Sequence, residues 1–442
     1  MPGKGAQTGM KLRQLSGMPA PWAAPILLLA GCSGSASIDP SLPAWSKVQI
    51  ESLRKWASSA AEDALPQFST GQLDAALESG DENAIRLRAR ELAEHLAAAH
   101  LRGCAGPDER ADWFMKDDAD SANLRGKLTD ALVSGAGLDG FFAGLRPSHP
   151  GYAALREAYL SETDPARRLT MARNMERWRW MPQELGQDYV LVNVPAFEVY
   201  LMQQGAPAQS WHAVVGKTAT PTPQIAATIT GVTFNPWWDV PPSIARGGHF
   251  SARGGYVVTR GHVRQRPGPR NALGQMKVEM PNPYAIYLHD TPSKGLFGAK
   301  TRAFSHGCVR VADPLSLAAK LLEGVRSRES IDLLVSPDKR DDLRGRISKP
   351  PTLPLAQPSA APPIKTTTVR LRADLPVYIA YFTAAPLPDG SLGFLPDIYA
   401  RDARIIDPAK PGKACSASIA TAAPSPGLRE GPENGNQADP GR

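Results

Sequence analysis

The apolar residues of this 442-residue chain change their spacing at Met181-Pro182, and this change constrains the fold more than any other feature. Upstream, Ala, Leu, Glu and Arg are abundant, and the apolar residues of Ala84–Leu96 share one helical stripe. Downstream, apolar residues alternate with polar ones or run over strand lengths. The predicted strands are residues 189–194, 197–202, 211–215, 227–234, 285–288 and 377–382. The sequence therefore predicts an α+β protein.

The same patterns divide the chain into regions. Inside the β part, a helix is predicted to begin at Asp313-Pro314, because Asp suits an N-cap and Pro the first helical position. Proline density indicates an extended insertion, and a segment dominated by Gly, Pro, Ser and Asn indicates disorder. The predicted regions are a signal peptide over residues 1–32, a helical N-terminal scaffold domain over 40–175, a mainly β catalytic domain over 176–407 with a Pro-rich insertion at 349–363, and a disordered tail over 408–442.

The N-terminus has the features of an export signal. Lys4, Lys11 and Arg13 form a basic region, and an apolar stretch over residues 22–30 follows it. Leu29-Ala-Gly-Cys32 resembles the lipobox of a bacterial lipoprotein, in which the cysteine carries the lipid. A plain secretory signal cleaved nearby is the alternative. We expect a periplasmic protein of a Gram-negative bacterium, attached to a membrane through Cys32.

Charge restricts the partners only in part. The chain has a formal net charge of +7, which suits an anionic surface or polymer. The basic residues are dispersed, and the sequence contains no zinc-finger or RNP-type signature, so no nucleic-acid partner is predicted. No segment approaches the roughly 20 consecutive apolar residues that a membrane-spanning helix needs.

The four cysteines have different expected roles. Cys32 is used by the lipid if the lipobox is functional. Cys104 and Cys415 could form a disulfide in an oxidising compartment, but their separation in the sequence neither supports nor forbids it. Cys308 is the cysteine left over, which indicates a free reactive thiol.

Chemistry at Cys308 requires a base, because only the thiolate is a strong nucleophile. His306 is near in sequence, but His289 follows a predicted strand and can meet the cysteine across a sheet, so it is the better candidate base. The carbonyl or the side chain of Asp290 could orient the imidazole. Gly307 permits an unusual backbone geometry, and the amide groups of Gly307 and Cys308 could then face a developing oxyanion.

Two plainer interpretations compete with this one. A single buried cysteine is often inert packing. Alternatively, Cys308, His306 and His289 could belong to a zinc site, but zinc needs three or four ligands. His249 and His262 are the other histidines of this stretch, and there is no Cys-x-x-Cys pair. Neither a metal nor a cofactor is predicted.

The motif Ser305-His-Gly-Cys-Val-Arg310, preceded by His289-Asp-Thr291, resembles the active-site signature of the L,D-transpeptidases. Further blocks resemble the large, scaffold-bearing (YcbB-like) branch of that family. These blocks are residues 175–182, 234–245, 263–274, 287–292 and 397–402.

The resemblance implies roles for individual residues. It implies that Cys308 is the nucleophile and His289 the base. His306, Gly307 and Arg310 take positions associated with the oxyanion site and substrate binding, and Ser305 is assigned to substrate binding with them. Trp237, Trp238 and Tyr287 are either lining residues of the cleft or core aromatics.

The resemblance also implies the reaction. The thiolate would attack the L,D bond of a tetrapeptide stem of peptidoglycan, release D-alanine, and pass the acyl group to an amine of another stem, which gives a 3→3 cross-link. Three alternatives stay open: hydrolysis of the same acyl-enzyme, as in an L,D-carboxypeptidase or endopeptidase; transfer to a lysine of an outer-membrane lipoprotein; and a catalytically silent wall-binding lipoprotein. The acceptor and the oligomeric state are not determined by the sequence.

This chain departs from the branch at two places. Tyr152–Arg156 runs almost directly into Met175, which leaves no room for the small peptidoglycan-binding domain that members often carry. The segment between Ala245 and Val263 is short for the cap over the cleft. Substrate gating is therefore expected to differ.

Overall fold

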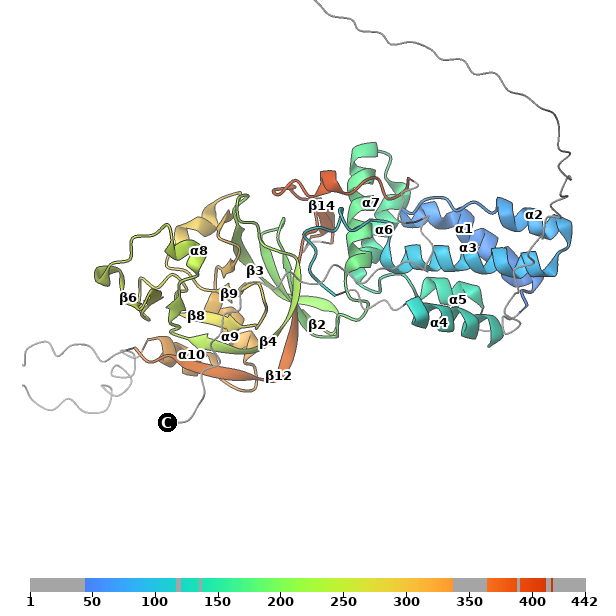
Figure 1. The fold of residues 1–442 in the computed structure, drawn as a ribbon. Coiled ribbons are helices and arrows are strands. Elements are labelled where there is room, and N and C mark those ends of the chain that lie inside the picture. Colours follow the sequence, from blue (N-terminus) through green and yellow to red (C-terminus); the bar gives the residue numbers. More distant parts are fainter. Residues whose placement is uncertain are drawn as a thin grey trace, which may run out of the picture. The chain divides into compact units, whose positions relative to one another are not determined.

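The structure is a computed structural model that describes residues 44–116, 121–134, 137–336, 364–387, 390–410 and 415. The predicted signal peptide with Cys32, the Pro-rich insertion and almost all of the predicted tail lie outside the described residues. The rest is α+β, with helices first and strands after them, as predicted (Figure 1). None of the described helices is long and apolar enough to cross a membrane.

Seven α-helices form the N-terminal part of the described chain. They begin where the sequence supplies caps: Ser46 and Gln49 form a capping box, and Asp164 caps a helix that begins with Pro165. The apolar faces of the first five helices pack around Leu53, Leu96 and Phe142, and those of the last two pack in a second core with Tyr189 and Tyr378 of the β part. The helices are α1 Lys47–Ser59, α2 Gly71–Ser79, α3 Glu82–Arg102, α4 Ser121–Val133, α5 Leu138–Ala143, α6 Pro150–Ser161 and α7 Pro165–Trp180.

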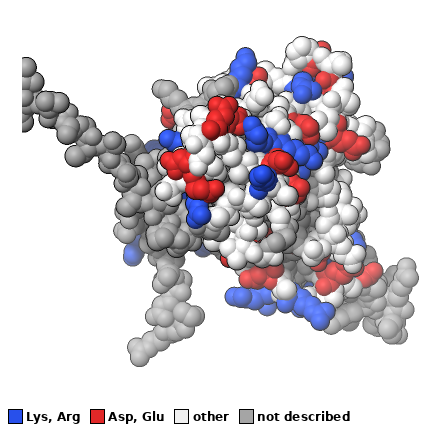
Figure 2. Space-filling model, turned by 90° about the vertical axis from the view of Figure 1, so that its right-hand side faces the viewer, with Lys and Arg blue, Asp and Glu red and all other residues white. Residues whose placement is uncertain are grey.

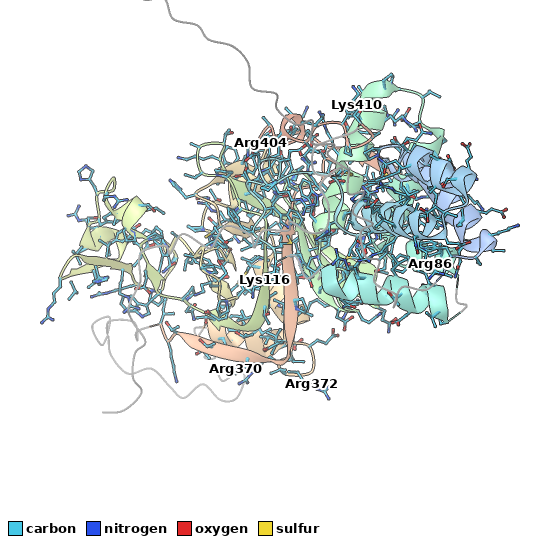
Figure 3. All side chains as sticks on the ribbon, turned by 45° about the vertical axis from the view of Figure 1, so that its right-hand side comes forward. Arg86, Lys116, Arg370, Arg372, Arg404 and Lys410 are labelled. Carbon is cyan, nitrogen blue, oxygen red and sulfur yellow. A yellow bond between two sulfur atoms is a disulfide. The ribbon has the colours of Figure 1, made fainter. Side chains whose placement is uncertain are left out.

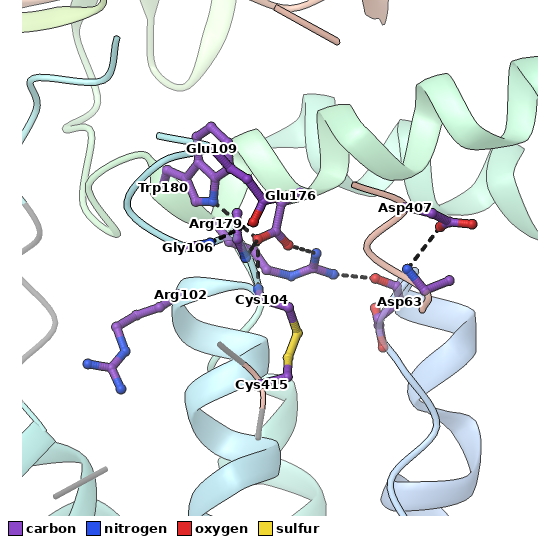
Figure 4. Close-up of a disulfide and its surroundings, with 12 residues drawn as sticks. Asp63, Arg102, Cys104, Gly106, Glu109, Glu176, Arg179, Trp180, Asp407 and Cys415 are labelled. Carbon is purple, nitrogen blue, oxygen red and sulfur yellow. Dashed lines mark hydrogen bonds and ion pairs between the residues drawn. A yellow bond between two sulfur atoms is a disulfide. The ribbon is translucent and has the colours of Figure 1, made fainter. Parts of the chain in front are cut away.

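The last helix, α7, is buried from Asn174 to its end, although this stretch contains several charged residues. Glu176 accepts hydrogen bonds from the backbone N–H of Cys104 and Ala105, both at 2.7 Å (Figure 4). Arg179 pairs with Glu176 at 3.3 Å and also donates to the Asp63 carbonyl. These hydrogen bonds and the ion pair replace the hydration that the two charged side chains lose on burial. They also connect α7 to the C-terminal ends of α3 and of the 3-10 helix η1 (Ala60–Asp63).

A disulfide joins Cys104, after α3, to Cys415 (Figure 4). The sequence left this pairing open. It connects positions that are 311 residues apart, one in the helical part and one near the end of the chain. Cys308 is a free cysteine.

The main sheet has nine strands in the order β10-β3-β11-β9-β8-β4-β12-β1-β2, and β2 also pairs with β3. Because of this extra pairing, the sheet closes on itself as a barrel. The β1–β12, β9–β11 and β3–β10 pairs are parallel, and the others are antiparallel. The strands are β1 Tyr189–Asn193, β2 Glu198–Gln203, β3 Ala206–Gly216, β4 Ile225–Phe234, β8 Met276–Glu279, β9 Leu288–His289, β10 Ala303–Ser305, β11 Val309–Val311 and β12 Thr367–Ala380.

Smaller elements complete the β part. A separate three-stranded sheet has the order β5-β7-β6, and β13 pairs with β14. The predicted helix after Asp313 is α9, and it packs against the barrel core with α10. The remaining elements are β5 Trp238–Asp239, α8 Pro242–Ala245, η2 Ala252–Gly254, β6 Tyr256–Thr259, β7 His262–Gln265, η3 Lys294–Gly298, α9 Pro314–Leu321, α10 Arg328–Val335, β13 Ala384–Pro386, β14 Leu392–Phe394 and η4 Asp402–Arg404.

One predicted strand is wrong. Residues 285–287 follow a turn at residues 283–284 and lie outside the sheet, and only Leu288–His289 form a strand. Asn282 makes the turn, because its side-chain oxygen accepts from the N–H of Ile286 and its amide donates to the Ile286 carbonyl at 2.6 Å. Ala285 is held at φ 52°. A side-chain amide thus replaces the strand ladder where the apolar pattern predicted a strand.

Candidate active site

One parallel pair of barrel strands brings the main candidate residues to one face. In the parallel β9–β11 pair, Val309 lies opposite Leu288 and Arg310 opposite His289. Val309 and Leu288 point into the barrel core. Because side chains alternate along a strand, Arg310 and His289 point to the other face, together with Cys308 and Tyr287 one pair earlier. Cys308 is thus a diagonal neighbour of His289 across this pair, at a spacing of roughly 7 Å between Cα atoms.

Cys308 lies half-buried in the bend between β10 and β11. Its Sγ is 3.6 Å from the Ala285 carbonyl oxygen. Burial raises the pKa of the thiol, while hydrogen bonds from the backbone N–H and the hydroxyl of Tyr287, and the charges of Arg310 and Lys277, act to lower it. Burial is the larger effect, so the resting cysteine is a protonated thiol.

His289 is 4% exposed, and its Nδ1 contacts the backbone carbonyl of Asp290. A carbonyl oxygen only accepts, so Nδ1 carries the proton and Nε2 keeps its lone pair. Burial, and after it the Arg310 charge, lowers the pKa of His289 to about 3. The imidazole is therefore neutral and has the tautomer that a general base needs.

The carboxylate of Asp290 serves the loop rather than the imidazole. It accepts from the N–H of Gln275 at 2.7 Å and of Thr291 at 2.6 Å, and it pairs with Lys294. Gly274 makes room for it: a Cβ there would lie 2.2 Å from Asp290 Oδ2, and the residue has φ +60°. Of the two predicted ways to orient His289, the structure uses the Asp290 carbonyl.

The bend before Cys308 differs from the predicted arrangement of two free amide groups. Gly307 has φ +117°, the unusual backbone geometry that was predicted, but its N–H already donates to Ser305 Oγ at 3.1 Å. The Ser305 hydroxyl, in a side chain that is 1% exposed, donates in turn to the Cys308 carbonyl at 2.6 Å. The N–H of Cys308 has no hydrogen-bond partner among the described residues, so of the two predicted amide donors it is the one left free.

Arg310 and His306 supply polar groups beside the thiol. Arg310 is half-buried, and its Nε has no hydrogen-bond partner in the described part of the chain. Burial lowers the pKa of Arg310, and the neighbouring Cys308 opposes that shift. Burial, Lys217 and Arg310 lower the pKa of His306, which is exposed. A guanidinium with an unused N–H suits a carboxylate or an oxyanion.

The predicted aromatic residues form a connected group outside the main core. Tyr287 lies next to the candidate base: its ring centroid is 5.7 Å from that of His289. Burial raises the pKa of its hydroxyl, and the neighbouring Cys308 raises it further. Trp237 and Trp238 are half-buried, and Arg264 stacks over Trp237 at 4.8 Å. The contact with His289 favours a lining role for Tyr287 over a core role.

The sequence did not indicate the buried hydroxyl groups that hold the backbone at Gly307 in place. Thr222 is fully buried, and its hydroxyl donates to the Gly307 carbonyl at 2.8 Å and accepts from the Gly216 N–H at 2.9 Å. The Tyr399 hydroxyl accepts from the Thr222 N–H at 3.2 Å and donates to the Gly216 carbonyl. Tyr399 belongs to the 397–402 block, the one sequence signal that pointed to this region.

Lys277 is a second residue that the sequence left unnoticed. It lies opposite His289 in the β8–β9 pair, and its Nζ is 5.1 Å from the centre of the Tyr287 ring. Its charge acts to lower the pKa of both His289 and Cys308. No group of three or more His, Cys, Asp and Glu that could bind a metal occurs within the described ranges.

The sequence of the region that contains this site matches a known protein family. Residues 187–329 match the YkuD family model, the L,D-transpeptidase catalytic domain. This part of the chain is an L,D-transpeptidase catalytic domain. A curated relative from Haemophilus influenzae, named "Putative L,D-transpeptidase", is 29% identical over 265 residues, which are 53% of this chain and 48% of the relative. The chain thus spans about half the length of that relative.

Solved L,D-transpeptidase structures match more distantly. The enzyme from Mycobacterium smegmatis is 16% identical, with 30% of this chain and 52% of that chain covered and a TM-score of 0.22. A mutant of the enzyme from Enterococcus faecium is 12% identical, with 46% and 52% covered and a TM-score of 0.22.

Proposed function

We propose that this protein is a peptidoglycan L,D-transpeptidase of the scaffold-bearing branch that forms 3→3 cross-links through an acyl-enzyme on Cys308. The observation that carries the proposal is that a neutral thiol and a neutral imidazole lie on the same face of the sheet, on neighbouring strands. Cys308 is a free thiol, and His289 is a buried neutral imidazole whose Nε2 lone pair is available. The L,D-transpeptidase domain gives this pair its substrate class.

In the first half-reaction, His289 Nε2 takes the thiol proton as the sulfur attacks the carbonyl of the L,D bond. The negative charge that develops on the carbonyl oxygen is stabilised by the Cys308 N–H, with Arg310 close by. When the tetrahedral intermediate collapses, the C–N bond breaks, and His289 returns the proton to the amine of the leaving D-alanine. A thioester remains on Cys308.

In the second half-reaction, the amine of an acceptor stem attacks the thioester. His289 removes a proton from that amine, the C–S bond breaks, and the thiolate regains the proton. The neutral resting pair suits this cycle, because the proton moves only while a bond to carbon forms or breaks. The thiol is thereby protected from reaction with other electrophiles between turnovers.

We also propose that the protein is exported to the periplasm and anchored through Cys32. The lipobox-like sequence Leu29-Ala-Gly-Cys32 motivates the anchor. The Cys104–Cys415 disulfide supports export, since disulfides persist in oxidising compartments. Membrane-fraction mass spectrometry should find a diacylglycerol-modified Cys32 as the first residue, and an unmodified mature N-terminus would contradict the anchor.

The test of the reaction uses purified protein and disaccharide-tetrapeptide, with products separated and weighed by mass spectrometry. Cross-linked dimers that have lost one D-alanine are expected. Disaccharide-tripeptide as the sole product would mean that water is the acceptor, and the transferase proposal would then fail.

The test of the residues uses a carbapenem, which should add its mass to Cys308. Cys308→Ala should remove the adduct, and His289→Ala should slow its formation at least about a hundredfold, the scale of general-base catalysis. His212→Ala is the matched control, because His212 is an exposed histidine of the same barrel that contacts Glu198. Equal losses in both histidine variants would remove the special role of His289.

A further inference from the structure

The excess positive charge of this chain is concentrated in one segment. Residues 240–278 contain six arginines and Lys277 but no Asp or Glu. These seven positive charges equal the net charge of the whole chain, +7, so the remaining residues are formally neutral together. Basic residues are dispersed along the sequence, but acidic residues are missing from this segment.

Five of the six arginines are exposed and form no ion pair with any residue that the structure describes. The sixth, Arg264, pairs with Asp239 at 2.6 Å. We use the name arginine face for the five exposed arginines of this segment that lack an ion pair, which are Arg246, Arg253, Arg260, Arg266 and Arg270. By contrast, the face in Figure 2 carries both signs of charge, interspersed.

The backbone that carries the arginine face is held in a defined shape. Its centre is the sheet β5-β7-β6, labelled at β6 and next to α8 in Figure 1. Gln265, 3% exposed, donates from its amide to the carbonyls of Gly254 at 3.0 Å and Arg270 at 2.8 Å. Asn271, 1% exposed, donates to the Pro236 carbonyl at 3.0 Å. These buried amides fix the loops of Arg253 and Arg270 to the segment that leads into β5.

The segment that carries the arginine face is connected to the candidate active site. After Arg270 the chain continues to Gln275, whose N–H donates to the Asp290 carboxylate at 2.7 Å. Two residues later, Lys277 lies opposite His289 in the β8–β9 pair. A ligand held by the arginine face is therefore held by a segment that ends beside His289.

We propose that the arginine face binds the free carboxylates of peptidoglycan stem peptides and so holds the polymer beside Cys308. This inference rests on the proposed function. Guanidinium groups bind carboxylates with two parallel hydrogen bonds. One exposed pair of this kind is weak, but several pairs along one polymer act together. The link from this segment to Asp290 and His289 favours the substrate over anionic lipid as the occupant.

The test measures binding of the full-length Cys308→Ala protein to purified sacculi by sedimentation, between about 50 mM and about 500 mM NaCl. The test variant adds Arg253→Gln and Arg260→Gln. The matched control adds Arg370→Gln and Arg372→Gln, two exposed arginines on β12 without an ion pair in the described structure (Figure 3). We expect the test variant to bind about fivefold more weakly at low salt and with a smaller salt dependence. The control variant should bind as well as the parent.

Two further measurements separate the possible failures. Both arginine pairs are also made in the protein with Cys308 intact, where carbapenem acylation should proceed at the unchanged rate. If acylation fails already in the parent, the proposed function is wrong; if acylation is normal and both arginine variants bind sacculi equally, the arginine face is wrong. Sedimentation with phosphatidylglycerol vesicles tests the other anionic surface. Loss of vesicle binding with unchanged sacculus binding would assign the face to lipid and overturn the proposal.

Discussion

The buried hydroxyl of Thr222 offers a sharp test of how this fold positions its nucleophile. Thr222→Val keeps the shape of the side chain but removes the donor to the Gly307 carbonyl and the acceptor for the Gly216 N–H. A buried backbone group that loses its partner costs about 1–3 kcal/mol, so two such losses should lower the free energy of unfolding by about 2–6 kcal/mol. Gly307 precedes Cys308 directly, so the bend that presents the sulfur should shift as well.

A displacement of about 1 Å at a reacting atom costs on the order of a hundredfold in rate. We therefore expect carbapenem acylation of Thr222→Val to be ten- to a hundredfold slower, measured by mass spectrometry well below the unfolding temperature, which a thermal melt gives. Thr222→Ser keeps the hydroxyl and should recover most of the rate. If Thr222→Val is destabilised but acylates at the parental rate, Thr222 is only structural and the positioning argument is refuted.

Three further predictions concern stability. Gly274→Ala should lower the melting temperature and slow acylation, because the new Cβ would collide with the Asp290 carboxylate that holds the loop after His289; an unchanged melting temperature would contradict this. His100 is fully buried, and burial lowers its pKa to about 3, so it stays neutral in the folded protein while the unfolded chain binds a proton below about pH 6.5. The free energy of unfolding should therefore fall as the pH drops from 6.5 towards 3. In denaturant titrations at pH 7 and pH 5, His100→Phe should reduce the loss of this free energy between the two pH values by about 2 kcal/mol. Equal losses in both proteins would argue against a neutral His100. Replacing Cys104 and Cys415 by serine should lower the melting temperature by as much as reduction of the parent does, and a reductant should have no further effect on that double variant.

Sequence reasoning found the elements whose signals are local. Caps and apolar stripes predicted the helices, and α9 begins at Pro314 as expected from Asp313-Pro314. Alternation predicted β1 to β4 with small errors at their ends. The prediction failed at residues 285–287, where Asn282 closes a turn through hydrogen bonds that no apolar pattern reveals.

The residues of the candidate site were likewise predictable only where the sequence signal was local. The motif with Cys308 and His289 was recognisable because catalysis needs those residue types, and the sheet does bring both to one face. The free amide groups of the expected oxyanion site were not predicted correctly, because the Gly307 N–H donates to the Ser305 hydroxyl. Thr222 and Tyr399 were missed, since their role depends on contacts between segments far apart in the chain.

By itself, the sequence determined the order of helices and strands, the motif with the candidate nucleophile and its candidate base, and the absence of acidic residues from residues 240–278. Only the tertiary structure decided that the Asp290 carbonyl and not its carboxylate contacts the His289 ring, that Cys104 pairs with Cys415, and that the segment with the arginine face leads to the residue opposite His289. The physical reason is the range of the interactions. Helix caps, alternation and charge act over a few residues and are written in local sequence, whereas hydrogen bonds and burial at the site depend on which distant segments the closed barrel brings together.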